Sequence, residues 1–166
     1  MNKLVVISSA ALLGLTACTG VQVETPPVAY TATKTLDAHG SSSFTVATYR
    51  KANGKREQVK GVPCTFEGDG FKSSFTTPAN VISPNLQGRT PVASVTSTLA
   101  GVSRSKTIEP YNETTTETTN SMTAAGAAGG LIGVMIGGAI AAAQNEARDK
   151  AQDVYGYPDV KIEFDG

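Results

Sequence analysis

The chain has few of the residues on which most catalytic and metal sites depend. Its 166 residues include two cysteines, one histidine and no tryptophan, too few to assemble a zinc site from histidine and cysteine. Neither sign of charge is in excess, with 14 Lys and Arg against 14 Asp and Glu, which argues against a nucleic-acid partner. No nucleophile and base stand at a recognisable spacing. We therefore expect no enzyme, no metal and no cofactor other than covalent lipid.

The amino terminus has the pattern of an export signal. Lys3 supplies the positive charge, and an uncharged apolar run follows from Leu4 to Ala17. That run is shorter than the roughly 20 residues that a membrane-spanning helix needs. We therefore assign residues 1–17 to a cleaved signal peptide.

The residues that end this run, Leu15-Thr16-Ala17-Cys18, resemble the lipobox of bacterial lipoproteins. The resemblance implies that Cys18 becomes the first residue of the mature chain and carries a diacylglycerol, with a further acyl chain such as palmitate on its amine. Two or three acyl chains anchor a protein stably. Thr19 stands where an aspartate favours the inner membrane in enterobacterial lipoproteins, and this implies the outer membrane, facing the periplasm. The alternative is an ordinary cleaved signal with Cys18 as a free thiol.

Lipidation of Cys18 would leave the second cysteine, Cys64, without an intramolecular partner. We expect it to be a small buried apolar residue. Residues 18–34 contain Pro26-Pro27 and few large apolar side chains, and we interpret them as a flexible tether.

Residues 35–111 are predicted to form the folded domain, because short segments rich in Val, Thr, Phe and Tyr alternate there with Gly, Pro, Asn and Ser. Residues 62–66 and 71–75 flank a loop with two glycines and predict a hairpin. Residues 91–99 are expected to form the longest strand, with 103–108 as its partner. The predicted core comprises Phe44, Val46, Phe66, Phe71, Phe75, Ile82, Val95, Leu99 and Ile108. We interpret His39 as a surface loop residue, and the cations Lys51, Lys55, Arg56 and Lys60 as a solvated basic loop rather than an anion-binding patch.

A polar linker rich in threonine, residues 112–121, separates this domain from a segment of small residues. Residues 122–143 carry no charge, and we predict a helix over 122–153. Several of its glycines recur on one helical face, which is how small residues let helices associate closely in membranes. These helix-packing residues are Gly126, Gly129, Gly130, Gly133 and Gly137. Seven large apolar side chains give only about −2 to −4 kcal/mol of insertion free energy, so membrane insertion is expected to be conditional. Burial against the protein's own sheet, or a flexible linker, remains the alternative.

Alternating Val160, Ile162 and Phe164 predict a final strand, residues 159–165, that rejoins the domain. The fold class expected is therefore mainly β: a small antiparallel β-sandwich with one Gly/Ala-rich helix inserted before the final strand, preceded by the lipoprotein signal.

In this order of features the chain resembles small bacterial envelope lipoproteins that join a β-sandwich, of transthyretin-like or PEGA type, to a glycine-zipper segment. The resemblance rests on Leu15 to Cys18, Gly61 to Thr65 with Thr77-Pro78, the glycine repeat, and Tyr157-Pro158-Asp159. It implies a second cysteine in the strand that includes residues 92–98, paired with Cys64, but no cysteine stands there.

Three functions follow as hypotheses. The first is a non-enzymatic, lipid-anchored lipoprotein of the outer membrane, whose glycine-zipper helix self-associates or binds another envelope protein in a structural or assembly role. The second is a periplasmic module that recognises peptidoglycan, a polysaccharide or a protein through loops such as residues 50–55. The third is an oligomeric pore formed by the glycine helices.

Overall fold

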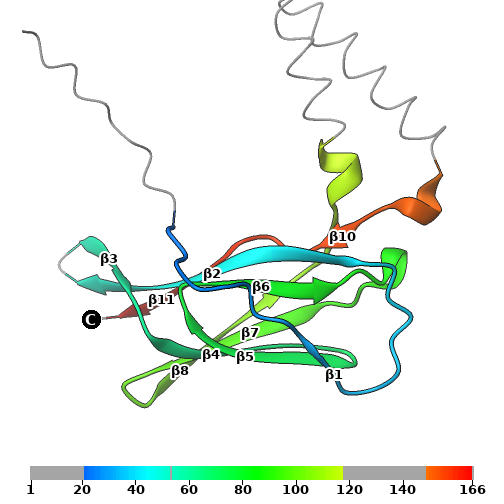
Figure 1. Cartoon of the computed structure of the whole chain (residues 1–166). Helices are drawn as coiled ribbons and strands as arrows, with labels where there is room; N and C mark the ends of the chain where they lie inside the picture. The colour runs from blue at the N-terminus through cyan, green and yellow to red at the C-terminus, as the bar shows by residue number, and fades with distance from the viewer. Residues whose placement is uncertain (1–20, 53, 118–148, 166) are drawn as a thin grey trace, which may run out of the picture.

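The computed structural model of the protein describes residues 21–52, 54–117 and 149–165. Cys18, the signal peptide and the five predicted helix-packing glycines lie outside these residues. The described chain is mainly β and folds as two facing sheets with a small paired ribbon beside them (Figure 1).

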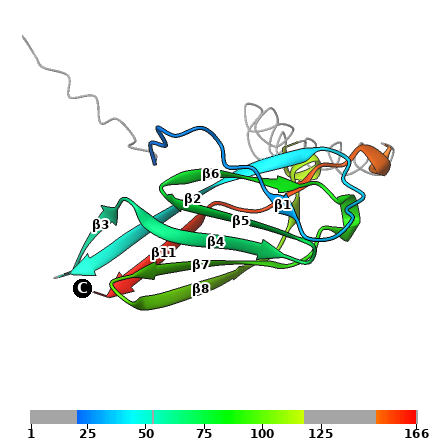
Figure 2. The ribbon, with the colours of Figure 1, turned by 60° about the horizontal axis from the view of Figure 1, so that its bottom comes forward.

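One sheet has the strand order β1-β5-β4-β7-β8 and is antiparallel throughout. It consists of β1 (Thr31–Ala32), β4 (Val62–Gly68), β5 (Phe71–Thr77), β7 (Ala93–Leu99) and β8 (Val102–Ile108). The predicted hairpin is confirmed as β4 and β5, joined by the two residues between Gly68 and Phe71. Figure 2 shows β8 as the outermost strand of this sheet.

The facing sheet is built around β2 (Ser41–Ala52), the longest strand among the described residues. The expectation that residues 91–99 form the longest strand was therefore wrong, since β7 is shorter. β6 (Ala79–Pro84) pairs with its first half, and β3 (Lys55–Val59) with its second half. On the other side, β11 (Val160–Asp165) pairs in parallel with residues 46–51. The final strand therefore rejoins the domain, but its parallel direction departs from the expected all-antiparallel sandwich. Parallel neighbours need a long connection, and here everything from β3 to β9 (Tyr111–Asn112) and β10 (Tyr155–Gly156) lies between β2 and β11 in the chain.

The core lies between the two sheets, as the alternation of buried and exposed residues along β2, β4 and β11 requires. Aromatic rings meet at its centre: Phe66 lies 5.0 Å from Phe44 and 5.4 Å from Tyr157 between ring centroids, both edge-on. The geometry is the one that aromatic pairs favour. Six of the nine predicted core residues are buried, and Phe75 and Leu99 are partly buried against them.

The prediction that Ile82, the ninth of these residues, belongs to the core was wrong. Val81 is fully buried and Ile82 is only half-buried, because successive residues of β6 point to opposite faces of its sheet. Two adjacent apolar residues in the sequence do not reveal which of them faces inward.

The predicted tether of residues 18–34 ends earlier than expected. Val28 forms a bridge with Val81, and β1 pairs with Lys72 and Phe71 at the edge of β5. Tyr30 packs on the ring of Phe71, with centroids 6.2 Å apart. An exposed sheet edge offers unpaired backbone groups, and this short segment covers part of that edge.

Two further boundaries differ from the prediction. Asn112 belongs to β9 and residues 113–117 are helical, so that this part of the predicted linker is folded. The helix predicted over 122–153 does not continue through its last residues. Asp149 has an extended backbone and caps a single 3-10 turn, η2 (Lys150–Gln152), by accepting a hydrogen bond from the Ala151 amide.

Candidate functional site

The structure holds the two ends of the predicted glycine segment at one end of the sandwich. The described chain stops after residue 117 and resumes at residue 149, and both stretches lie above the same end of the sheets (Figure 1). There β9 and β10 pair antiparallel, with Asn112 opposite Tyr155 and Tyr111 opposite Gly156. We call the residues whose side chains or backbone groups join these stretches by hydrogen bonds the clamp: Asn85, Asn112, Glu113, Thr114, Asp153, Val154 and Tyr155.

Asn85 is the centre of the clamp and is 2% exposed. Its side-chain amide donates to the carbonyl of Asp153 at 3.2 Å, and its side-chain oxygen accepts from the amides of Gln87 and Tyr155, both at 3.0 Å. Its backbone joins Gly40 and His39. A buried polar side chain must find partners, and Asn85 finds them on three separate segments of the chain.

Asp153, 3% exposed, links the returning stretch to the outgoing one. Its carboxylate accepts a 2.6 Å hydrogen bond from the side-chain amide of Asn112. The side-chain oxygen of Asn112 in turn accepts from the amide of Thr115 at 3.0 Å. Asn112 thereby caps the helical turn at 113–117, a role for which asparagine is among the preferred residues. One side chain both starts the outgoing turn and fixes the returning chain.

Two more contacts tie the stretches together through the backbone. The amide of Glu113 donates to the carbonyl of Val154 at 2.9 Å. The amide of Val154 donates to the hydroxyl of Thr114 at 3.0 Å. The clamp is therefore built of reciprocal hydrogen bonds rather than of apolar packing.

A glycine lets the clamp close. A Cβ atom at Gly156 would stand inside van der Waals contact with a carboxylate oxygen of Glu113 and with the hydroxyl of Ser42. Partial burial raises the pKa of Glu113, the hydrogen bond with Ser42 opposes that rise, and the charge of Glu117 adds to it.

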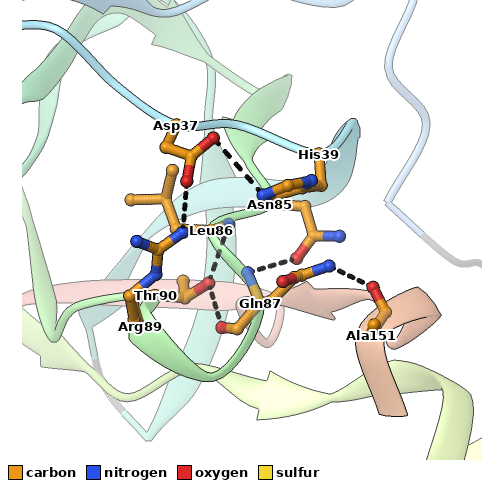
Figure 3. A network of polar contacts seen from close by, with 8 residues as sticks. All are labelled: Asp37, His39, Asn85, Leu86, Gln87, Arg89, Thr90 and Ala151. Atoms are coloured by element: carbon orange, nitrogen blue, oxygen red, sulfur yellow. Dashed lines mark hydrogen bonds and ion pairs between the residues drawn. The ribbon is translucent and has the colours of Figure 1, made fainter. Parts of the chain in front are cut away.

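A second polar network supports the clamp from η1 (Gln87–Arg89), as Figure 3 shows. The Gln87 side chain donates to the carbonyl of Ala151, which fixes η2 against this loop. Thr90 closes the loop by accepting from the amide of Leu86 and donating to the carbonyl of Gln87. Gln87 itself has a positive φ of 54°, an uncommon conformation for a residue with a side chain.

At the rim of this network lies the only histidine of the sequence. The carboxylate of Asp37 lies 2.7 Å from Arg89 and 3.4 Å from the ring of His39. The hydrogen bond from Arg89, with the charges of His39 and Arg89, lowers the pKa of Asp37. His39 is exposed, as expected of a loop residue, although a carboxylate does lie beside it.

No protein-family model, curated protein or solved structure matches this chain. Within residues 21–52, 54–117 and 149–165, no three His, Cys, Asp or Glu side chains gather in a way that could hold a metal ion. In the same residues, no helix has both the length and the apolar character needed to cross a membrane.

The opposite end of the sandwich carries the cations that the sequence placed around a turn. Together with their neighbour Arg50, the four predicted residues Lys51, Lys55, Arg56 and Lys60 form what we call the basic arm. Arg56 pairs with Glu163 at 3.0 Å and stacks on the ring of Tyr49 at 4.0 Å.

Beside the arm, a cavity of about 530 Å³ opens between the sheets, with a mainly apolar lining that includes Leu99, Val102 and Phe164. Arg50 and Arg104 stand among its lining residues.

Cys64 is buried, and burial raises the pKa of its thiol. This agrees with the expectation of an inert core residue, since the thiolate is the reactive form. Its partner across the ladder is Ser97 on β7, inside the strand where the family resemblance implies a second cysteine. Ser97 therefore stands where that cysteine would pair.

The sequence reasoning placed the functional residues at Cys18 and the glycines, which the described residues do not include, and it missed the clamp. One signal was present. Asn112 precedes Glu113-Thr114-Thr115, a pattern of a helix cap, but the run of threonines was interpreted as a linker. Nothing in the sequence points to Asn85 or Asp153, which bond to each other although they lie 68 positions apart along the chain.

Proposed function

We propose that this chain is a non-enzymatic, lipid-anchored lipoprotein of the outer membrane, in which the β-sandwich is a scaffold that presents the glycine-rich segment for assembly in the cell envelope. The Leu15-Thr16-Ala17-Cys18 pattern supports the anchor. The Gly129, Gly133 and Gly137 repeat supports self-association or packing with another envelope protein.

The observation that carries the proposal is the clamp. Buried hydrogen bonds among Asn85, Asn112 and Asp153 hold both ends of residues 118–148 beside each other. A domain that only needed a connection between β8 and β11 could use a short loop. Here a segment of 31 residues leaves and returns at one fixed place, which supports a role in presenting that segment.

Membrane fractionation combined with chemical crosslinking tests the proposal. Wild type should incorporate labelled palmitate, fractionate with membranes and give crosslinked oligomers or a crosslinked partner. Cys18→Ala should lose both palmitate and membrane association. Gly133→Leu should lose the crosslinked species but keep the palmitate, because bulk on the glycine face prevents close approach.

The matched control is Leu131→Phe, which adds bulk on the face that the sequence places opposite the glycines. It should leave the crosslinks unchanged. Palmitate labelling that persists in Cys18→Ala would reject the lipid anchor. Crosslinked species that survive Gly133→Leu would reject association through the glycine face.

A second candidate function is a binding module for peptidoglycan, and the apolar cavity beside the basic arm favours it. Its volume of about 530 Å³ falls within the range of small-molecule sites, about 300–1,000 Å³. Co-sedimentation with purified peptidoglycan tests this candidate. Binding that Arg50→Ala weakens and Lys72→Ala leaves intact would support it, and no sedimentation with peptidoglycan would remove it.

A further inference from the structure

The described chain begins at the same end of the sandwich as the basic arm. Gln22, Glu24 and Thr25 lie against Lys60 and the Thr76 to Pro78 corner, where they line a shared hollow. Glu24 reaches Lys60 at 3.9 Å. Gln22 is four positions after Cys18, and an extended chain covers at most about 14 Å over that span. A lipid on Cys18 would therefore hold this end of the domain near the membrane surface.

The same end is rich in positive charge. Between residues 50 and 60 the chain has five cations, the basic arm, and one anion, Glu57. Two carboxylates of the neighbouring strand β11 also lie at this end, where Glu163 pairs with Arg56 and Asp165 with Arg104. Arg56 and Lys60 each have an acidic partner, but Arg50, Lys51 and Lys55 make no ion pair within the part of the chain that the structure describes. All three are exposed at the far end of the β2–β3 hairpin.

The clamp end has the opposite charge. Residues 109–117 and 149–159 together contain six acidic residues and one lysine. Ser42, beside the clamp, and Ala52, at the tip of the arm, are ten positions apart on β2. At about 3.3 Å per residue they are separated by about 33 Å. The domain is thus basic where the tether arrives and acidic where the glycine segment leaves.

We propose that the basic arm binds the anionic phospholipid headgroups of the membrane that holds Cys18, so that the clamp and the glycine segment face away from that membrane. This inference rests on the proposed function, because it uses the lipid on Cys18 to choose the surface. Lysine or arginine near an anionic bilayer surface gains about 1 kcal/mol, or about fivefold in partitioning, per residue. The acidic clamp end would be repelled by the same surface. The glycine segment would then meet a second copy of the chain or another envelope protein, rather than the bilayer beneath the domain.

Vesicle sedimentation tests the surface without the lipid anchor. The mature chain, residues 18–166 with Cys18→Ser, is mixed with phosphatidylcholine vesicles or with vesicles in which about one third of the lipid is phosphatidylglycerol. We expect binding to the anionic vesicles that high salt abolishes. The double variant Lys51→Gln/Lys55→Gln should lower the partition coefficient by about 25-fold, the product of two fivefold effects.

The matched control is Lys72→Gln/Lys106→Gln, which removes the same charge from exposed positions of β5 and β8. It should change partitioning far less than the arm variant. Equal binding to both vesicle types would overturn the inference. Equal losses in the two double variants would do so as well, because they would show attraction by net charge and not by the arm.

A second experiment reads the orientation of the acylated protein. A fluorophore is attached at Lys55→Cys on the arm or at Thr116→Cys near the clamp, both exposed sites, and the vesicles carry nitroxide-labelled headgroups. The probe at 55 should be quenched strongly and the probe at 116 weakly. The reverse order would reject the orientation even if Cys18 is acylated. Absence of palmitate on Cys18 would instead reject the anchor, and the sedimentation result would still report on the arm.

Discussion

Replacing Ser97 by cysteine should create a disulfide with Cys64, and the strand register allows its geometry to be derived. β7 and β8 are joined by the two residues Ala100 and Gly101, both with positive φ. In such a hairpin Leu99 and Val102 exchange hydrogen bonds, and alternate pairs along the ladder do the same. Ser97 therefore directs its backbone groups toward Arg104 on β8 and away from β4.

It follows that Ser97 and Cys64 form a non-hydrogen-bonded pair, in which the Cα atoms of opposite residues are about 4.5 Å apart. A disulfide needs a Cα separation of about 4.4–6.8 Å. The Cys64 sulfur and the Ser97 hydroxyl are already hydrogen-bonded in the core. The bridge would close a loop between residues 33 positions apart, for which the chain-entropy relation gives about 4 kcal/mol of stabilisation.

For a domain of roughly 110 residues, 4 kcal/mol corresponds to a rise in Tm of about 15 °C. The assay compares the oxidised and reduced forms of Ser97→Cys in a Cys18→Ser background, by thermal unfolding and by counting free thiols with a mass-tagged alkylating reagent. Thr96→Cys, which points to the other face of β7, serves as control and should keep two free thiols. Two free thiols in oxidised, folded Ser97→Cys would show that the register between β4 and β7 is wrong.

Three further predictions concern the clamp. Gly156→Ala should destabilise the domain by about 1 kcal/mol in urea unfolding, because its Cβ would displace the side-chain ends of Glu113 and Ser42. Adding Glu113→Ala should restore part of the loss, and full stability in Gly156→Ala alone would contradict the close approach. Asn85→Ala should lower the free energy of unfolding by at least about 2 kcal/mol, since it leaves two amides and a carbonyl without partners. The exposed control Gln58→Ala should have little effect. Equal losses of stability in the two variants would refute the reasoning. Glu113→Gln should stabilise the domain at neutral pH. Folding raises the pKa of Glu113 above 4.5. Protonated Glu113 therefore contributes its full stabilisation of the fold below pH 4.5, and this contribution is lost as pH rises through the folded pKa. The difference in unfolding free energy between Glu113→Gln and wild type should shrink as pH falls, and a difference that grows would contradict the prediction.

Local patterns in the sequence predicted the strands well where a turn signal stood beside them. The glycines between Glu67 and Phe71 located the β4–β5 hairpin, and alternation identified the inward face of β7 and of the final strand. Such signals are local, because turn chemistry and the period of two both act over a few residues. The same reasoning could not choose between Val81 and Ile82, since a short apolar strand shows no period.

The clamp lay beyond such reasoning for a different physical reason. Its residues are polar and therefore resemble loop residues in composition, and their burial depends on partners far away in the sequence. Asp153 is buried because Asn85 and Asn112 satisfy it, and each partner is satisfied by further segments. Only the assembled sheets bring these residues together, so no window of sequence contains the signal. The tether is shorter than predicted for the same reason, since Val28 and β1 pair with strands about 40 to 50 positions away.

The clamp also bears on how the glycine segment could meet a bilayer. A single crossing would carry the returning stretch to the other side of the membrane and would break its six hydrogen bonds to Asn85, Gln87, Asn112, Glu113 and Thr114. At about 0.5–1.5 kcal/mol net for each bond, this costs about 3–9 kcal/mol. The insertion free energy of residues 122–143 is only about 2–4 kcal/mol in favour. These two ranges overlap between about 3 and 4 kcal/mol, but the same crossing would also separate β11 from its ladder with β2, so the folded domain opposes a single crossing. Under the proposed function, the predicted glycine face would therefore associate with another protein rather than anchor the chain across a membrane.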